Sequence, residues 1–131
     1  MIKKINHIGI IVRNLDEALV LYEKGIGLKL SHIETAKDCR MAFFPCGEVL
    51  VEVFEPTCPS FLMDYLDTHG PGMHHVAYEV TDINEQFNMA SEVFSLRDKA
   101  PRPGANGSQI FFLDPASIFD AETEFVEMPK D

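Results

Sequence analysis

"HIGIIVRNLDEAL" (residues 7–19) and "HVAYEVTDINEQF" (residues 75–87) are two versions of one pattern within the same chain. In each, alternating apolar residues predict a strand, and an Asn or Asp followed three positions later by Glu predicts a helix N-terminus. Aligned on their histidines, the two stretches match at strand, cap and helix positions: Ile8 with Val76, Val12 with Val80, Asn14 with Asp82, Leu15 with Ile83, and Glu17 with Glu85. Each half of the chain is therefore predicted to begin with a strand that passes directly into a helix.

Further strands follow each helix and complete the repeat. Apolar runs predict them at 28–34, 40–44 and 49–55 in the first half and at 108–114 and 121–127 in the second, where "SLRDKA" (95–100) is the candidate for the remaining strand. The last strands also match, because "VEVFE" (51–55) lies over "TEFVE" (123–127) and sets Glu52 over Glu124. The chain is interpreted as two βαβββ modules, 1–56 and 72–131, joined by a linker at 57–71 with a short helix.

The size of the modules predicts how they combine. A module of roughly 60 residues buries too little apolar surface to be stable by itself. We therefore expect a single α+β domain over residues 1–131. In it, the two tandem modules form one curved eight-stranded mixed sheet, with the helices covering its outer face.

Four ionisable side chains occupy equivalent positions in the two modules: His7, Glu52, His75 and Glu124. Strand alternation places each histidine on the same face as a small neighbour, Gly9 or Ala77, which leaves room above the sheet. A single His or Glu on a strand is more often structural. Two imidazoles and two carboxylates at repeat-related positions, however, suit one divalent ion such as Co, Zn, Ni, Mn or Fe. The repeat thus predicts a metal site, and alternation assigns the adjacent His74 to the opposite face as a structural residue.

Composition narrows the class of protein. The net charge of −10 argues against a nucleic-acid partner, and no apolar run is long enough to span a membrane. The opening "MIKKINHIGIIV" does not have the form of a signal peptide. Three cysteines without a CxxC pair predict reduced thiols in a cytoplasmic protein.

The duplicated βαβββ pattern is similar to that of a known protein family. With "HIGIIVRNLDEALVLYE", "VLVEVFEP" and "HHVAYEVTDI", the chain resembles the vicinal oxygen chelate superfamily, which includes glyoxalase I, methylmalonyl-CoA epimerase, extradiol dioxygenases and bleomycin-binding proteins. The resemblance covers nearly the whole chain. It implies metal ligands on the first and last strand of each module, which are His7, Glu52, His75 and Glu124 by motif. It also implies a homodimer, the assembly that members often form.

Two stretches and one spacing resemble the epimerase branch: "GPGMHHVAYEV" (70–80), "PRPGANGSQIFFLDP" (101–115), and the nine positions from Pro115 to Glu124. Two features depart from that branch. The Lys-Ser-Thr-Gly-Gly segment is replaced by "ASIFDAE" (116–122), which brings two extra acidic residues, and "RMAFF" (40–44) has no carboxylate where some epimerases place an acid–base glutamate. Glu34 and Asp38 are the nearby alternatives for that second group.

The resemblance implies a metal-dependent epimerase or isomerase that acts on a small-molecule substrate, an acyl-CoA. It would abstract a proton alpha to a carbonyl through an enolate, with Glu124 as both ligand and catalytic base. One alternative is a glyoxalase I-like lyase acting on a thiol adduct, for which Arg40, Arg97 and Arg102 are candidate contacts to glutathione carboxylates. The other is a bleomycin-type drug-binding resistance protein, which would have neither metal nor catalysis.

Overall fold

The computed structural model describes residues 1–130, and the chain divides into two compact units. One unit is His7–His74, and the other combines Met1–Asn6 with the segment that starts at His75. The boundaries fall within strands β1 (Ile2–Ile11) and β5 (Gly72–Val80), so each of these strands contributes to both units. The first six residues therefore pack with the second repeat rather than with the first.

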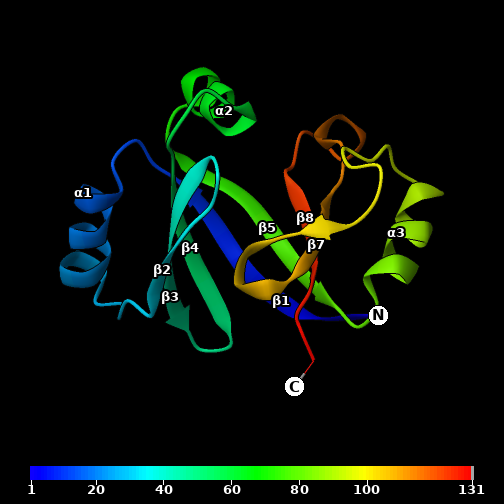
Figure 1. Cartoon of the computed structure of the whole chain (residues 1–131), viewed down its shortest axis with the longest axis horizontal. Coiled ribbons are helices and arrows are strands. Elements are labelled where there is room, and N and C mark those ends of the chain that lie inside the picture. The colour runs from blue at the N-terminus through cyan, green and yellow to red at the C-terminus, as the bar shows by residue number, and fades with distance from the viewer. Residues whose placement is uncertain (131) are drawn as a thin grey trace. The chain divides into compact units, whose positions relative to one another are not determined.

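The unit His7–His74 contains the first repeat and a following helix (Figure 1). After β1, its elements are α1 (Leu15–Val20), the π-helical turn η1 (Leu21–Ile26), β2 (His32–Thr35), β3 (Cys39–Cys46), β4 (Val49–Pro56) and α2 (Phe61–His69). The strand order is β2-β3-β4-β1, in which β1 and β4 are parallel and the other pairs are antiparallel. This is the βαβββ arrangement predicted from the sequence.

Helix α1 begins where the cap pattern predicts. The Asn14 side chain accepts a hydrogen bond from the Glu17 backbone N–H at 3.0 Å, and Gly27 ends the following turn in a left-handed conformation (φ 89°) that favours glycine. The helix packs on β3 and β4, and the core between them is formed by the buried residues Leu15, Ala18, Ala42, Phe44 and Val53. Covering this face leaves the opposite face of the strands, which carries His7 and Glu52, available for a site.

The other unit repeats the plan. After β5, its elements are α3 (Ile83–Ser91), β6 (Arg102–Pro103), the 3₁₀ turn η2 (Ala105–Gly107), β7 (Gln109–Phe112), the 3₁₀ turn η3 (Pro115–Ser117) and β8 (Thr123–Glu127). The order is β5-β8-β7-β6, with β5 and β8 parallel. Asp82 caps α3 by accepting from the Asn84 and Glu85 N–H groups, and α3 packs on β7 and β8.

Strand pairing confirms the α+β class and a mixed sheet of eight strands in the order β2-β3-β4-β1-β5-β8-β7-β6. The strand predicted at 95–100 is wrong, since Leu96 forms only an isolated bridge to Leu113 and the sixth strand is Arg102–Pro103. The reason is that the Asp98 carboxylate, not a backbone carbonyl, accepts the Phe112 N–H. No helix among residues 1–130 is long and apolar enough to cross a membrane.

Candidate metal centre

In the unit His7–His74, a buried histidine faces a buried glutamate. The His7 Nε2 lies 3.6 Å from the Glu52 Oε2, and each side chain is only 8% exposed. The parallel pairing of β1 with β4 sets Glu52 opposite Gly9, two residues beyond His7. Because residues two apart share a face of a strand, His7, Gly9 and Glu52 lie on one side, and the missing side chain of Gly9 leaves room between the other two.

The second unit builds the same pair in the same way. The His75 Nε2 lies 3.2 Å from the Glu124 Oε1, with side chains 5% and 6% exposed. Strands β5 and β8 are parallel, and Glu124 lies opposite Ala77, again two residues beyond the histidine. A repeat recognised in sequence thus produces two equivalent pairs of chemically identical groups.

The donor groups of each pair suit half of a metal site (a half-site). A buried carboxylate is costly unless a positive group, hydrogen-bond donor or metal ion compensates it. Imidazole nitrogen and carboxylate oxygen are both ligands of zinc and of the neighbouring transition metals. Each pair therefore offers one nitrogen and one oxygen donor in a position protected from water, and this donor chemistry fits a divalent ion.

His74 has different surroundings from those of His75. Its ring packs edge-on against Tyr65 at 4.5 Å and against Phe54 at 5.3 Å, measured between ring centroids. These aromatic contacts lie within the unit His7–His74, where β4 and α2 supply the partners. This environment agrees with the structural role expected of His74.

The arginines considered as glutathione contacts each have a carboxylate of the same chain beside them. Arg97 pairs with Glu122 at 2.7 Å, Arg102 with Asp98 at 2.9 Å, and Arg40 with Glu55 at 3.6 Å. The negative charge that Glu122 adds to the 116–122 segment is therefore balanced internally. An arginine already in such a pair is a poorer receptor for a substrate carboxylate, because binding would have to displace the internal partner.

Glu79 is a further buried charged residue, outside the predicted set of site residues. Glu79 shares the strand face of His75 and Ala77, so the alternation contained the signal. Its carboxylate accepts from Asn6 at 2.8 Å and pairs with Lys3 at 3.2 Å. Burial acts to raise the pKa of Glu79, but the hydrogen bonds from Asn6 and Lys3 outweigh it, so the pKa lies below its ordinary value.

Comparison with known proteins identifies the family. Residues 6–112 match the family described as the glyoxalase/bleomycin resistance protein/dioxygenase superfamily. The chain belongs to this superfamily. The matched residues include His7, Glu52 and His75, while Glu124 lies beyond them in β8.

Similar members of the superfamily include characterised enzymes. The uncharacterized protein YqjC of Bacillus subtilis is 36% identical, over 97% of this chain and 93% of its own. The mitochondrial methylmalonyl-CoA epimerase of Dictyostelium discoideum is 27% identical over 96% of this chain and 79% of its own. Among solved structures, a Streptomyces coelicolor methylmalonyl-CoA epimerase variant in complex with 2-nitronate-propionyl-CoA has a TM-score of 0.92 and 26% identity, covering 99% of this chain and 100% of that one.

Proposed function

We propose that this superfamily member is a divalent-metal-dependent epimerase of the methylmalonyl-CoA epimerase type, which moves a proton alpha to a carbonyl of an acyl-CoA. The observation that carries the proposal is the pair of equivalent, buried His–Glu contacts, one in each βαβββ repeat. The similarity to two methylmalonyl-CoA epimerases over nearly the whole chain supports this branch of the superfamily.

The two half-sites are proposed to hold one ion together, with His7, Glu52, His75 and Glu124 as ligands. The metal would be Co, Zn, Ni, Mn or Fe, since these ions accept mixed nitrogen and oxygen ligands. When bound, such an ion polarises the substrate carbonyl and makes the neighbouring C–H proton more acidic.

Two carboxylates are proposed to move the proton. Glu124 is the base that removes it, because its carboxylate is buried and is held beside His75. Inversion requires a second group that returns a proton to the opposite side of the carbon. The half-buried Glu34 is the candidate. It pairs across the strands with Met41, which pairs with Phe54, so Glu34 shares the sheet face of Glu52.

Deuterium incorporation tests the reaction. The metal-loaded protein is incubated in D₂O with methylmalonyl-CoA and, separately, with methylglyoxal and a thiol. Deuterium at C2 of the acyl-CoA, without turnover of the thiol adduct, is the expected result. Turnover of the thiol adduct alone would replace the proposal with a glyoxalase I-like lyase. Absence of metal in the purified protein would favour a drug-binding protein of the bleomycin type.

The assignment of Glu34 has its own test. In Glu34→Gln, deuterium exchange by Glu124 continues, but inversion at C2 slows, because the amide cannot return a proton. The ratio of exchange to inversion, measured with one epimer of the substrate, therefore rises. An unchanged ratio would exclude Glu34 and direct the search to Asp38.

We also propose the cellular compartment and the oligomeric state of the protein. Cys39, Cys46 and Cys58 are free cysteines, which supports a reducing, cytoplasmic compartment. The family resemblance supports a homodimer, and sedimentation equilibrium of the purified protein would measure its mass directly.

A further inference from the structure

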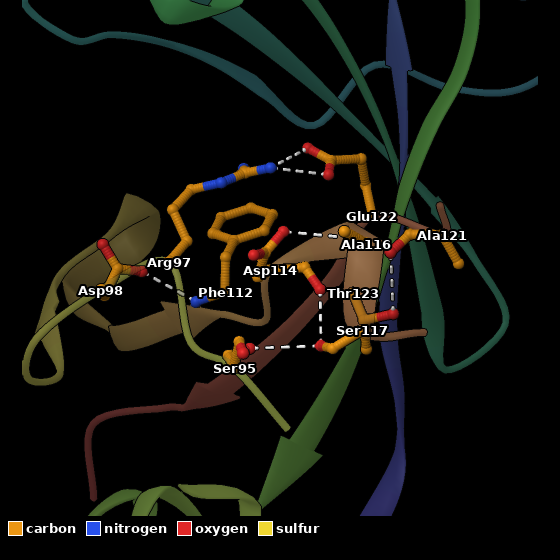
Figure 2. Close-up of polar contacts among 10 residues, drawn as sticks. All are labelled: Ser95, Arg97, Asp98, Phe112, Asp114, Ala116, Ser117, Ala121, Glu122 and Thr123. Atoms are coloured by element: carbon orange, nitrogen blue, oxygen red, sulfur yellow. Dashed lines mark hydrogen bonds and ion pairs between the residues drawn. The ribbon is translucent and has the colours of Figure 1, made fainter. Parts of the chain in front are cut away.

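An ion pair lies next to the His75–Glu124 half-site and has no part in the proposed proton transfer. The Arg97 Nη2 donates to both oxygens of Glu122, at 2.8 Å and 2.7 Å, and the Glu122 side chain is only 4% exposed (Figure 2). Glu122 is two residues before Glu124, immediately ahead of β8. A buried carboxylate held at both oxygens restricts the chain at this point more than an exposed ion pair does.

The backbone of Glu122 links the same residue to the histidine strand. Its carbonyl accepts a hydrogen bond from the Val76 N–H at 3.3 Å, directly after His75. The side chain and main chain of Glu122 thus connect Arg97, β5 and the start of β8. Any shift of Glu122 would change the position of Glu124 relative to His75.

Arg97 also lies against the Phe112 ring, which in turn contacts His75. Its guanidinium carbon lies 5.4 Å from the centroid of the Phe112 ring, and the Arg102 guanidinium lies at 5.9 Å. The Phe112 ring is in turn edge-on to His75, with a centroid separation of 5.7 Å. Asp98 fixes the backbone of Phe112 by accepting its N–H at 2.8 Å. One arginine therefore supports the surroundings of both His75 and Glu124.

The segment between β7 and β8 makes such support necessary. Phe119 and Asp120 both have left-handed backbone angles, with φ of 57° and 61°, which non-glycine residues rarely adopt. Before them, the Ser117 hydroxyl donates to the carbonyls of Asp114 and Ser95 (Figure 2). After them, the Arg97–Glu122 pair anchors the chain, beside a longer local hydrogen bond of 3.5 Å from the Thr123 hydroxyl to the Ala121 carbonyl. Without it, relaxation of this strained turn would pass directly to Glu124.

We propose that Arg97 is a positioning residue, which acts through Glu122 and Phe112 to hold Glu124 and His75 in the geometry that binds the metal. This inference rests on the metal site proposed above. It assigns a role to Glu122, an acidic residue of the segment 116–122 in which the chain departs from the epimerase pattern.

The test separates positioning from stability. Arg97→Lys keeps the charge but loses the guanidinium, which contacts both the Glu122 carboxylate and the Phe112 ring. Arg97→Met combined with Glu122→Met replaces the pair by apolar side chains, an exchange that often preserves the stability of a buried pair. The matched control is Arg13→Lys, since Arg13 pairs with Asp67 at 3.3 Å between side chains that are more than half exposed.

Two readouts are measured on the full chain: Co²⁺ affinity by calorimetry, and the exchange rate of the Val76 amide by NMR without metal. For Arg97→Lys and the double variant we expect cooperative unfolding but Co²⁺ affinity weakened about 10- to 100-fold, the range found for residues that orient metal ligands. Exchange of the Val76 amide should accelerate about tenfold in Arg97→Lys, which corresponds to a free energy of local opening lower by about 1.4 kcal/mol. Arg13→Lys should match the unmodified protein in both readouts.

Co²⁺ affinity within twofold of the unmodified protein in both Arg97 variants would overturn the positioning role while leaving the proposed metal site intact. Failure of the unmodified protein to bind Co²⁺ would instead overturn the metal site. In that case the exchange rate of the Val76 amide still tests whether Arg97 holds Glu122 in place. An unchanged rate in Arg97→Lys would show that Arg97 does not restrain Glu122.

Discussion

Adjacent histidines provide a matched pair of substitutions, His75→Ala and His74→Ala. Both residues are 6% exposed and are neighbours in β5, yet their contacts differ. His75 lies beside the Glu124 carboxylate, whereas His74 packs against the rings of Phe54 and Tyr65. We expect both substitutions to destabilise the protein, and only His75→Ala to abolish metal binding.

The size of the two effects follows from these contacts. The contact between the His75 ring and the buried Glu124 carboxylate is comparable to a hydrogen bond to a charged group, which contributes about 1.5–3 kcal/mol, so His75→Ala loses about that much. Each aromatic contact contributes about 0.5–1.5 kcal/mol, so the two contacts of His74 contribute about 1–3 kcal/mol. At about 3–4 °C per kcal/mol for a domain of this size, both variants should unfold roughly 3–12 °C lower.

Metal affinity is where the variants should differ. Changing a residue that only orients a ligand weakens binding about 10- to 100-fold, so loss of a ligand itself should exceed 100-fold. Calorimetric titration with Co²⁺, together with metal analysis of the purified variants, measures this. His75→Ala that retains its metal, or His74→Ala that loses it, would refute the assignment of the two faces.

Three further predictions concern other carboxyl and thiol groups. Glu124→Gln should slow deuterium incorporation at C2 of the acyl-CoA by about 10²- to 10⁴-fold, the usual contribution of a general base, and an unchanged rate would remove Glu124 from that role. Because the folded-state pKa of Glu79 is lowered, its contribution to stability is present above the ordinary value of 4.5 and is lost as pH falls through the folded value. Urea unfolding from neutral to acid pH should therefore show a weaker pH dependence in Glu79→Gln, and parallel curves would contradict this. Burial, followed by the charge of Asp38, raises the pKa of Cys39 to about 12, so this thiol stays protonated at neutral pH. In native protein, iodoacetamide should therefore label the exposed Cys46 and leave Cys39 unmodified. Mass spectrometry of the labelled peptides measures this, and labelling of Cys39 would contradict it.

Much of the fold could be predicted from local patterns. Asn14 and Asp82 cap their helices as the sequence indicates, because an N-cap depends only on residues within one helical turn. The strand that was wrongly predicted at 95–100 shows the limit of this reasoning. The residue types in this stretch could not predict that the Asp98 side chain accepts the N–H of Phe112, because that residue is fourteen positions away.

The sequence by itself determined which residues could form a site. The repeat assigns His7 to His75 and Glu52 to Glu124, and strand alternation assigns each histidine a face, since both depend only on position along the chain. Only the tertiary structure decided that each glutamate lies within 3.6 Å of its histidine, because parallel pairing joins strands that are distant in sequence. It likewise decided that Arg97 neutralises Glu122, a partner set by the path of the chain between β7 and β8.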